Sequence, residues 1–190
     1  SKRSDICEED KSSLSLILEL VKLIDYMISP SDNTAETTLN NTLSFVFKMC
    51  SPLARKAGIT ILTSRSNLLD MEQYSISQSK SDAVYHTVVN LIQNSIKYSG
   101  SHNVTQIFIT YNKKDHIISI YDNGNGISQI DRNKLFVFGE RLGKSKEEGN
   151  GWGLAISKMI MKKAGGDLTI RADTAQTIFD ISLSSSEIIV

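Results

Sequence analysis

Three polar residues fall on one face of a predicted helix near the middle of the chain. Asn90, Asn94 and Lys97 are four and three residues apart, so a single stripe of that helix carries all three side chains. Asparagine is disfavoured inside helices, so the two amides are either solvated or neutral oxygen ligands to Mg²⁺. In the second case, Lys97 would meet a phosphate as a point charge, and Tyr98 would stack on a base or cover the core.

A short glycine-rich string, Asp-Asn-Gly-Asn-Gly at 122–126, directly follows a predicted strand. Its glycines tolerate positive φ angles and let a ligand approach the backbone closely. At the strand end, Asp122 can accept a hydrogen bond from an exocyclic amine such as that of adenine. Taken alone, the same string also fits an ordinary turn.

A second glycine-rich string, Gly-Asn-Gly-Trp-Gly-Leu at 149–154, opens a predicted helix. Alternate glycines at a helix N-terminus expose N–H groups where the helix dipole favours an anion such as phosphate. No Lys-Ser or Lys-Thr follows, as a P-loop would require, and no strand precedes the glycines, as a dinucleotide fingerprint would require. By itself the string fits a phosphate site or a flexible loop.

The elements that must position these residues alternate between helical and strand patterns. Predicted helices span 39–57, 81–98 and 153–164, and predicted strands span 59–62, 106–111, 117–121, 168–171 and 178–183. On the first helix, the expected buried face is Leu43, Val46, Phe47, Cys50, Leu53 and Ala54. The element order predicts an α+β fold, with a mixed, largely antiparallel sheet and helices on one face. The long irregular segment 122–151 is typical of a lid or binding loop.

An apolar helical segment and a polar break precede these elements. The segment 14–28 is apolar on more than one side of a predicted helix, so it is either a core helix or one arm of a hairpin completed by a second subunit. Ser-Pro-Ser-Asp-Asn at 29–33 breaks it. We expect 1–30 to be a frayed N-terminus and the end of a dimerisation helix, and 31–190 to be one catalytic domain.

Composition excludes several classes of protein. Of the 190 residues, 21 are Lys or Arg and 21 are Asp or Glu, which argues against nucleic acid as a partner held by bulk charge. No apolar run is long enough to cross a membrane. Cys7 and Cys50 form no disulfide framework, which favours a cytoplasmic location. We expect a longer parent protein, which could itself be membrane-anchored.

Taken in order, these motifs resemble those of the catalytic and ATP-binding domain of sensor histidine kinases. The wider superfamily also includes Hsp90, type II topoisomerases and MutL. The resemblance covers roughly 35–184 and implies a Bergerat-type ATP-binding sandwich with ATP and Mg²⁺ as cofactors. It also implies that helix 14–28 is the end of a dimerisation hairpin, so the protein would be a homodimer.

The resemblance assigns a role to each motif. The segment 90–98 is similar to the N box, with Asn94 as the Mg²⁺ ligand and Lys97 on the phosphates, both in the catalytic set. Asp122 would read the adenine amino group, joined through water by Thr177, and 135–138 resembles the F box at the hinge of an ATP lid. The implied nucleotide-binding residues are Asn90, Asn94, Lys97, Tyr98, Asp122, Gly124, Gly126, Ile127, Gly149, Asn150, Gly151, Trp152, Gly153, Leu154 and Thr177.

The implied activity is transfer of the ATP γ-phosphate to a histidine outside this chain. None of His86, His102 and His116 is followed by the acidic residue of the acceptor box, and each is expected to be structural or solvated. The phosphate would pass to a response-regulator aspartate or a histidine phosphotransfer domain.

Two alternatives stay open. A degenerate docking module with weak or no ATP use is suggested by Trp152, which stands where the family usually has a smaller residue. A superfamily ATPase that couples hydrolysis to conformational change would need a catalytic Glu near the start of helix 81–98. The only acid there is Asp82, which sits too early.

Overall fold

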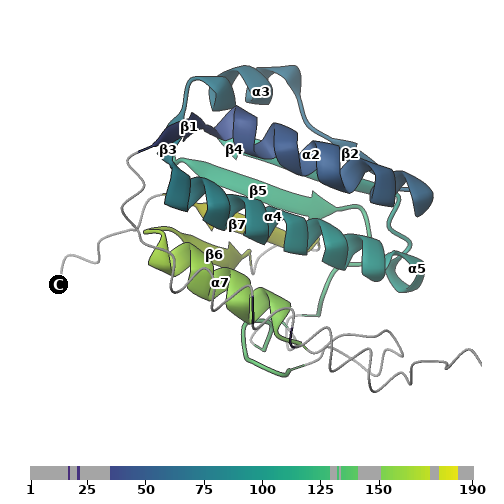
Figure 1. The fold of residues 1–190 in the computed structure, drawn as a ribbon. Coiled ribbons are helices and arrows are strands. Elements are labelled where there is room, and N and C mark those ends of the chain that lie inside the picture. Colours follow the sequence, from purple (N-terminus) through teal and green to yellow (C-terminus); the bar gives the residue numbers. More distant parts are fainter. Residues whose placement is uncertain are drawn as a thin grey trace, which may run out of the picture.

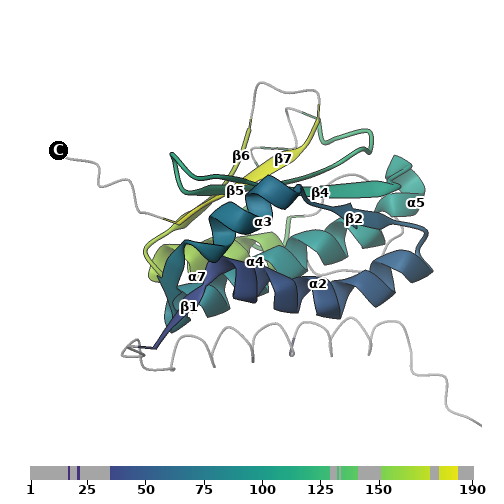
Figure 2. The same cartoon turned by 90° about the horizontal axis from the view of Figure 1, so that it is seen from above.

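Three long helices lie against one face of a five-stranded sheet (Figure 1, Figure 2). The computed structural model describes residues 17, 21, 35–128, 132, 134–140, 151–171 and 176–183. The two layers consist of the helices α2 (Leu39–Lys56), α4 (Gln78–Lys97) and α7 (Gly153–Lys163), and the strands β2 (Thr60–Leu62), β4 (Gln106–Asn112), β5 (Ile117–Asp122), β6 (Asp167–Ile170) and β7 (Ile178–Ser182). The expected α+β architecture is confirmed.

The sheet order is β2-β4-β5-β7-β6, and only the β2–β4 pair is parallel. In the β4–β5 hairpin, Ile107 pairs with Asp122 and Asn112 with Ile117. Side chains alternate between the faces of a strand, and the buried Ile118 and Ile120 face the helices. Asp122 has the same parity, so the pleat directs its carboxylate from the end of β5 toward the helix layer.

Helix α4 lies between α2 and α7 (Figure 1). It begins at Ser77, whose hydroxyl accepts a hydrogen bond from the Lys80 N–H at 3.4 Å, as an N-cap does. Val84, Val88 and Leu91 form part of its buried face. This apolar packing fixes the rotation of α4 about its axis and therefore the direction of its polar stripe.

The buried face of α2 agrees with the sequence pattern at most positions, since Leu43, Val46, Cys50 and Ala54 are buried. The expectation for Leu53 is wrong, because its side chain is 51% exposed. Phe45 and Met49 are exposed on the same side, eight and four residues earlier. The buried arc of α2 is thus narrower than its apolar arc.

Four small elements complete the described fold, and of these the sequence pattern indicated only a short strand at the end of 68–76. They are the paired strands β1 (Glu36–Thr38) and β3 (Ser75–Ser77), helix α3 (Arg65–Glu72) and helix α5 (Ser99–His102). By its sequence pattern the segment 68–76 fits a helix or a strand, and it forms the second half of α3 followed by β3. The Ser64 hydroxyl caps α3 by accepting from the Asn67 N–H at 3.2 Å, so an N-cap signal was present in the sequence.

Most of the predicted helix 14–28, and the predicted boundary near residue 30, lie outside the described residues. Ile17 and Val21 are helical and are 55% and 54% exposed. Among the described residues, no helix combines the length and apolar composition that crossing a membrane would need.

Candidate functional site

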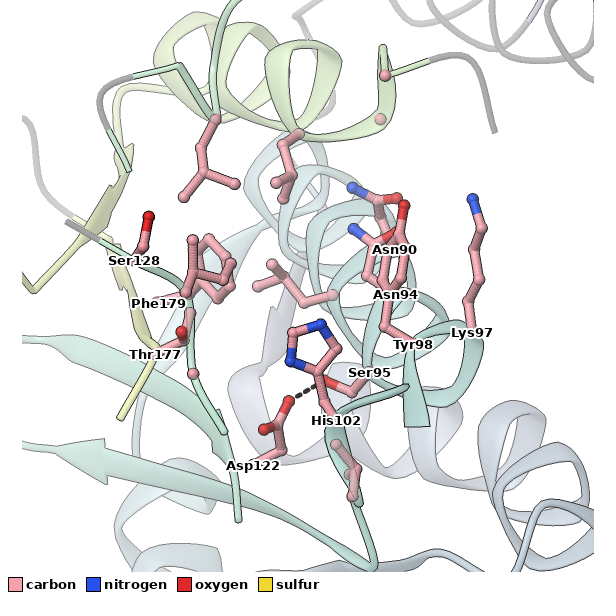
Figure 3. A pocket seen from close by; sticks show the side chains of 18 of the residues that line it. Asn90, Asn94, Ser95, Lys97, Tyr98, His102, Asp122, Ser128, Thr177 and Phe179 are labelled. Atoms are coloured by element: carbon pink, nitrogen blue, oxygen red, sulfur yellow. Dashed lines mark hydrogen bonds between the residues drawn. The ribbon is translucent and has the colours of Figure 1, made fainter. Parts of the chain in front are cut away.

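A cavity of about 320 Å³ opens between α4, the end of β5, the start of β7 and the N-terminus of α7 (Figure 3). A volume of this size suits a small-molecule ligand. The cavity brings together residues that are far apart in the sequence, and most of the predicted site residues are among them. The predicted residues that line it are Asn90, Asn94, Lys97, Tyr98, Asp122, Gly126, Ile127, Gly151, Gly153, Leu154 and Thr177.

Four predicted residues are not in that lining. Gly149 and Asn150 lie outside the described residues. Gly124 lies beside the cavity, where a Cβ would be 2.8 Å from the Val104 side chain and 2.9 Å from Asp122 Oδ1, so a side chain there would have to displace its neighbours. Trp152 packs instead on the hydrophobic core and against Phe138, so it does not crowd the cavity.

One wall of the cavity is the polar stripe of α4. Figure 3 shows Asn90 and Asn94 one turn apart, with Lys97 extending beside Tyr98. The Lys97 Nζ is 5.0 Å from the centroid of the Tyr98 ring. This wall offers two amides and an ammonium group to a ligand, which is a suitable donor set for a metal-bound anion.

The amide of Asn90 is held in place from α7. Its Nδ2 donates to the Ser157 hydroxyl at 2.9 Å, and its Oδ1 lies where a Cβ on Gly153 would be only 2.6 Å away. Ser157 is almost fully buried. Glycine at position 153 therefore lets the start of α7 approach α4 without displacing the Asn90 amide.

Asp122 lies at the opposite end of the cavity (Figure 3). Its Oδ2 accepts a hydrogen bond from the Ser95 hydroxyl at 2.8 Å, and its Oδ1 accepts one from the Gly124 N–H at 3.0 Å. A carboxylate has about four acceptor positions, so it can still receive an exocyclic amine. Nearby, the buried Thr177 Oγ1 has no hydrogen-bond partner among the described residues, as expected of an atom that awaits a ligand or water.

The N-terminus of α7 forms the third wall. Gly151 has φ +70°, and a Cβ there would collide with the Glu140 carbonyl oxygen. The Gly139 N–H donates to the Gly151 carbonyl at 3.2 Å, and the Phe138 and Trp152 rings meet edge to face at 5.2 Å. These contacts hold Gly139 close to Gly151, and Glu140, Gly151 and Gly153 line the cavity, where the first N–H groups of a helix favour an anion.

Several lining residues were not predicted, and His102 is the clearest case. It was expected to be structural or solvated, yet its ring lies in the cavity between Tyr98 and Asp122 (Figure 3). Its ring meets the Tyr98 ring edge to face at 6.4 Å. The placement depends on α5, a four-residue helix that follows α4 directly and that no periodicity could reveal. The other unpredicted lining residues are Leu91, Ser95, Val104, Ser128, Leu135, Glu140 and Phe179.

The donor set suits a ligand with two unlike ends. At one end, Asp122 and Thr177 can recognise a base that carries an amine. At the other, Asn94, Lys97 and the α7 N-terminus favour negative charge. Among the described residues, no cluster of three or more His, Cys, Asp or Glu could hold a metal by itself, so a cation here would depend on amide oxygens and on the ligand's own phosphates.

Comparison with known proteins gives a family match over this region. Residues 79–187 match the model of the histidine kinase-, DNA gyrase B-, and HSP90-like ATPase family. Sensor histidine kinase YcbM of Bacillus subtilis is 28% identical over 111 residues, covering 56% of this chain and 36% of that protein. Heme sensor protein HssS of Staphylococcus saprophyticus is 27% identical over 190 residues, covering 95% of this chain and 39% of that protein. The chain thus spans well under half the length of these relatives.

Solved structures share the fold. The full-length ShkA structure in complex with AMPPNP has a TM-score of 0.66 at 19% identity, covering 94% of this chain and 37% of that chain. The mycobacterial sensor histidine kinase MprB has a TM-score of 0.58 at 19% identity, covering 77% of this chain and 95% of that chain.

Proposed function

This chain belongs to the histidine kinase-, DNA gyrase B-, and HSP90-like ATPase family and is a catalytic domain of the histidine-kinase type, and on that premise we propose that its cavity binds ATP with Mg²⁺ for phosphoryl transfer to a histidine. The acceptor histidine would lie outside this chain. The observation that carries the proposal is the single cavity that combines a polar helix stripe, a strand-end carboxylate and a glycine-lined helix N-terminus. ShkA, which shares the fold, was solved with AMPPNP.

In this proposal, each end of the nucleotide has its own partners. Asp122 accepts the adenine amino group, and Thr177 contributes its unpartnered hydroxyl at the same end. Tyr98 lies along the adenine or ribose. Asn94 supplies a neutral oxygen to Mg²⁺, Asn90 lies beside it, and the remaining coordination comes from phosphates and water. The wider set of nucleotide contacts proposed from the sequence also includes Gly124, Gly126, Ile127, Gly149, Asn150, Gly151, Trp152, Gly153 and Leu154.

The reaction would be an in-line displacement at phosphorus. A histidine imidazole nitrogen forms the new P–N bond, the bond from the γ-phosphorus to the β–γ bridging oxygen breaks, and ADP leaves. When bound, Mg²⁺ would neutralise charge on the phosphates. The chain itself would contribute positioning and electrostatics, with Lys97 as a cation and the N–H groups at Gly151 and Gly153 as donors. We infer that the phosphate then passes to a response-regulator aspartate or a histidine phosphotransfer domain.

The structure gives little support to either alternative function, the docking module or the ATPase. A degenerate docking module would be favoured by a blocked cavity, but Trp152 packs on Phe138 and does not line the cavity. An ATPase of this superfamily would need a catalytic Glu near the start of the helix that carries Asn90, and the acid there is Asp82. Asp82 instead accepts a hydrogen bond from Gln78 at 2.8 Å, two turns before Asn90.

Dimerisation belongs to the same proposal. We propose that helix 14–28 pairs with its counterpart in a second copy, supported by apolar residues on more than one side and by the exposure of Ile17 and Val21. Leu20→Lys should lower the dimer fraction in sedimentation while leaving ATP affinity unchanged. An unchanged dimer mass would contradict this role for the helix.

Calorimetric titration of the chain with ATP and Mg²⁺ tests the central proposal. Saturable, Mg²⁺-dependent binding is expected, and Asn94→Ala or Asp122→Ala should abolish it. Asn112→Ala, an asparagine at the β4–β5 turn far from the cavity, serves as the control and should bind like the wild type. No affinity at millimolar ATP would favour the docking module.

The transfer step is tested in the full-length parent protein. Incubation with ATP labelled in the γ-phosphate should yield an acid-labile phosphohistidine. Steady ATP turnover without a phosphoprotein would favour the ATPase alternative.

A further inference from the structure

Arg132 is the one charged side chain among the described residues that is buried, with 7% of its surface exposed. It follows the glycine-rich turn after β5, and its backbone N–H donates to the Ser128 carbonyl at 3.1 Å. Burial of a guanidinium is costly unless hydrogen bonds replace its water. The partners of this group therefore indicate why it is there.

The guanidinium bridges three separate segments of backbone. Nε donates to the Ile127 carbonyl at 3.0 Å, Nη1 to the Arg171 carbonyl at 2.8 Å, and Nη2 to the Gln176 carbonyl at 3.5 Å. These carbonyls belong to the turn after β5, the residue after β6 and the approach to β7. The planar fork of an arginine can reach several such acceptors at once, whereas a lysine presents one point charge.

Two of these acceptors adjoin the base end of the cavity. Ile127 itself lines the cavity, and Gln176 precedes Thr177, which also lines it. The Arg171 N–H donates to the Ile178 carbonyl at 3.0 Å, so the third acceptor is tied to β7 as well. One buried side chain thus fixes the distance between the Ile127 turn and the Thr177 strand.

We propose that Arg132 is a positioning residue for nucleotide recognition, which fixes the relative position of the residues at the base end of the cavity by holding the Ile127 turn against the start of β7. This inference rests on the proposed nucleotide-binding function. Arg132 does not line the cavity, and it acts through the residues that do. Because the hydrogen bonds lie beside the base, their loss affects every nucleotide that carries the base, whether or not its phosphates bind Mg²⁺.

The test compares Arg132→Met and Arg132→Lys with the wild type. Methionine fills similar space without donors, and lysine keeps one cation. Equilibrium dissociation constants are measured for ATP with Mg²⁺ and for ADP without it. We expect Arg132→Met to weaken both by about tenfold, the effect of losing one charge-assisted hydrogen bond, with Arg132→Lys intermediate. In the full-length protein, KM for ATP should rise while kcat at saturating ATP stays unchanged.

Lys80→Met is the matched control. Lys80 Nζ donates to the Leu183 carbonyl at 2.6 Å, so it also joins a side-chain cation to a backbone carbonyl beside β7, but it does not line the cavity. This variant should lose stability without losing nucleotide affinity. An affinity loss equal to that of Arg132→Met would mean that general loosening of the fold, rather than local positioning, lowers affinity.

The outcomes separate this inference from the function on which it rests. If the wild type binds neither nucleotide, both are refuted. If the wild type binds and a folded Arg132→Met binds equally well, only the positioning role is refuted. If Arg132→Met fails to fold, Arg132→Lys decides, and wild-type affinity in that variant overturns the inference. A loss confined to ATP with Mg²⁺ would place the effect at the phosphates and also contradict it.

Discussion

The close contact between α4 and α7 predicts that Gly153→Ala destabilises the fold through one side chain. The new Cβ would be 2.6 Å from Asn90 Oδ1, which is 0.8 Å inside an ordinary contact of 3.4 Å. The Asn90 amide must therefore shift away, and the shift would break its 2.9 Å bond to the buried Ser157 hydroxyl. Loss of a buried hydrogen bond costs about 1–3 kcal/mol.

The higher helix propensity of alanine opposes this loss of stability. Alanine stabilises a helix over glycine by about 0.5–1 kcal/mol, and Gly153 is the first residue of α7. We therefore expect Gly153→Ala to lower the free energy of unfolding by about 1 kcal/mol in the wild type. With Asn90→Ala as the background, the collision is absent and the same change should be neutral or stabilising.

Urea unfolding of the four proteins in this double-mutant cycle measures the coupling. The expected coupling between positions 90 and 153 is about 1–3 kcal/mol, within the range for residues in direct contact. A coupling below about 0.5 kcal/mol would refute the argument, because distant and independent sites give values of that size. Nucleotide must be absent, since ligand binding would add its own stabilisation.

Three further predictions concern the two ends of the cavity and one buried phenol. Asn94→Asp should alter the Mg²⁺ concentration needed for ATP binding, which titration of Mg²⁺ at fixed ATP measures. Because Asn94 is half-exposed, the same change should alter the free energy of unfolding by less than about 0.5 kcal/mol. Asp122→Asn should weaken ATP binding by about 10- to 100-fold and reduce the preference for ATP over GTP, because an amide is a poorer acceptor than a carboxylate; equal affinities for the two nucleotides in the wild type would contradict this role. Burial, with smaller contributions from Tyr74 and Asp70, raises the pKa of Tyr111 to about 12. Since the folded state disfavours the phenolate, the stability from Tyr111 is complete below about pH 10 and is lost between pH 10 and 12, by about 2–3 kcal/mol. Tyr111→Phe should remove that loss in unfolding measured across this pH range, and an unchanged alkaline slope would refute the assignment.

Sequence periodicity located the α4 stripe because helical geometry alone places Asn90 and Asn94 on one face. In the same way, the pleat of β5 determines the direction of Asp122 once the strand is recognised. Periodicity shows which residues share a face but not how wide the buried arc is. For that reason Leu53 was expected to be buried and is exposed.

Other features depend on contacts between distant segments. Arg132 is an isolated arginine in a polar loop of the sequence, and its burial becomes visible only when β6 and β7 fold beside the β5 turn. His102 reaches the cavity through a four-residue helix, which is too short for a periodic signal. The roles of such residues follow from the packing of distant segments and cannot be inferred from the periodicity of the sequence.

The contacts between Gly139 and Gly151 and between Phe138 and Trp152 have a consequence for sequence divergence. They hold the residues on either side of the segment 141–150 close together. Once two ends are joined, each doubling of the length between them adds only about 0.6 kcal/mol of closure entropy. A change in the length of this segment should therefore cost the fold little stability.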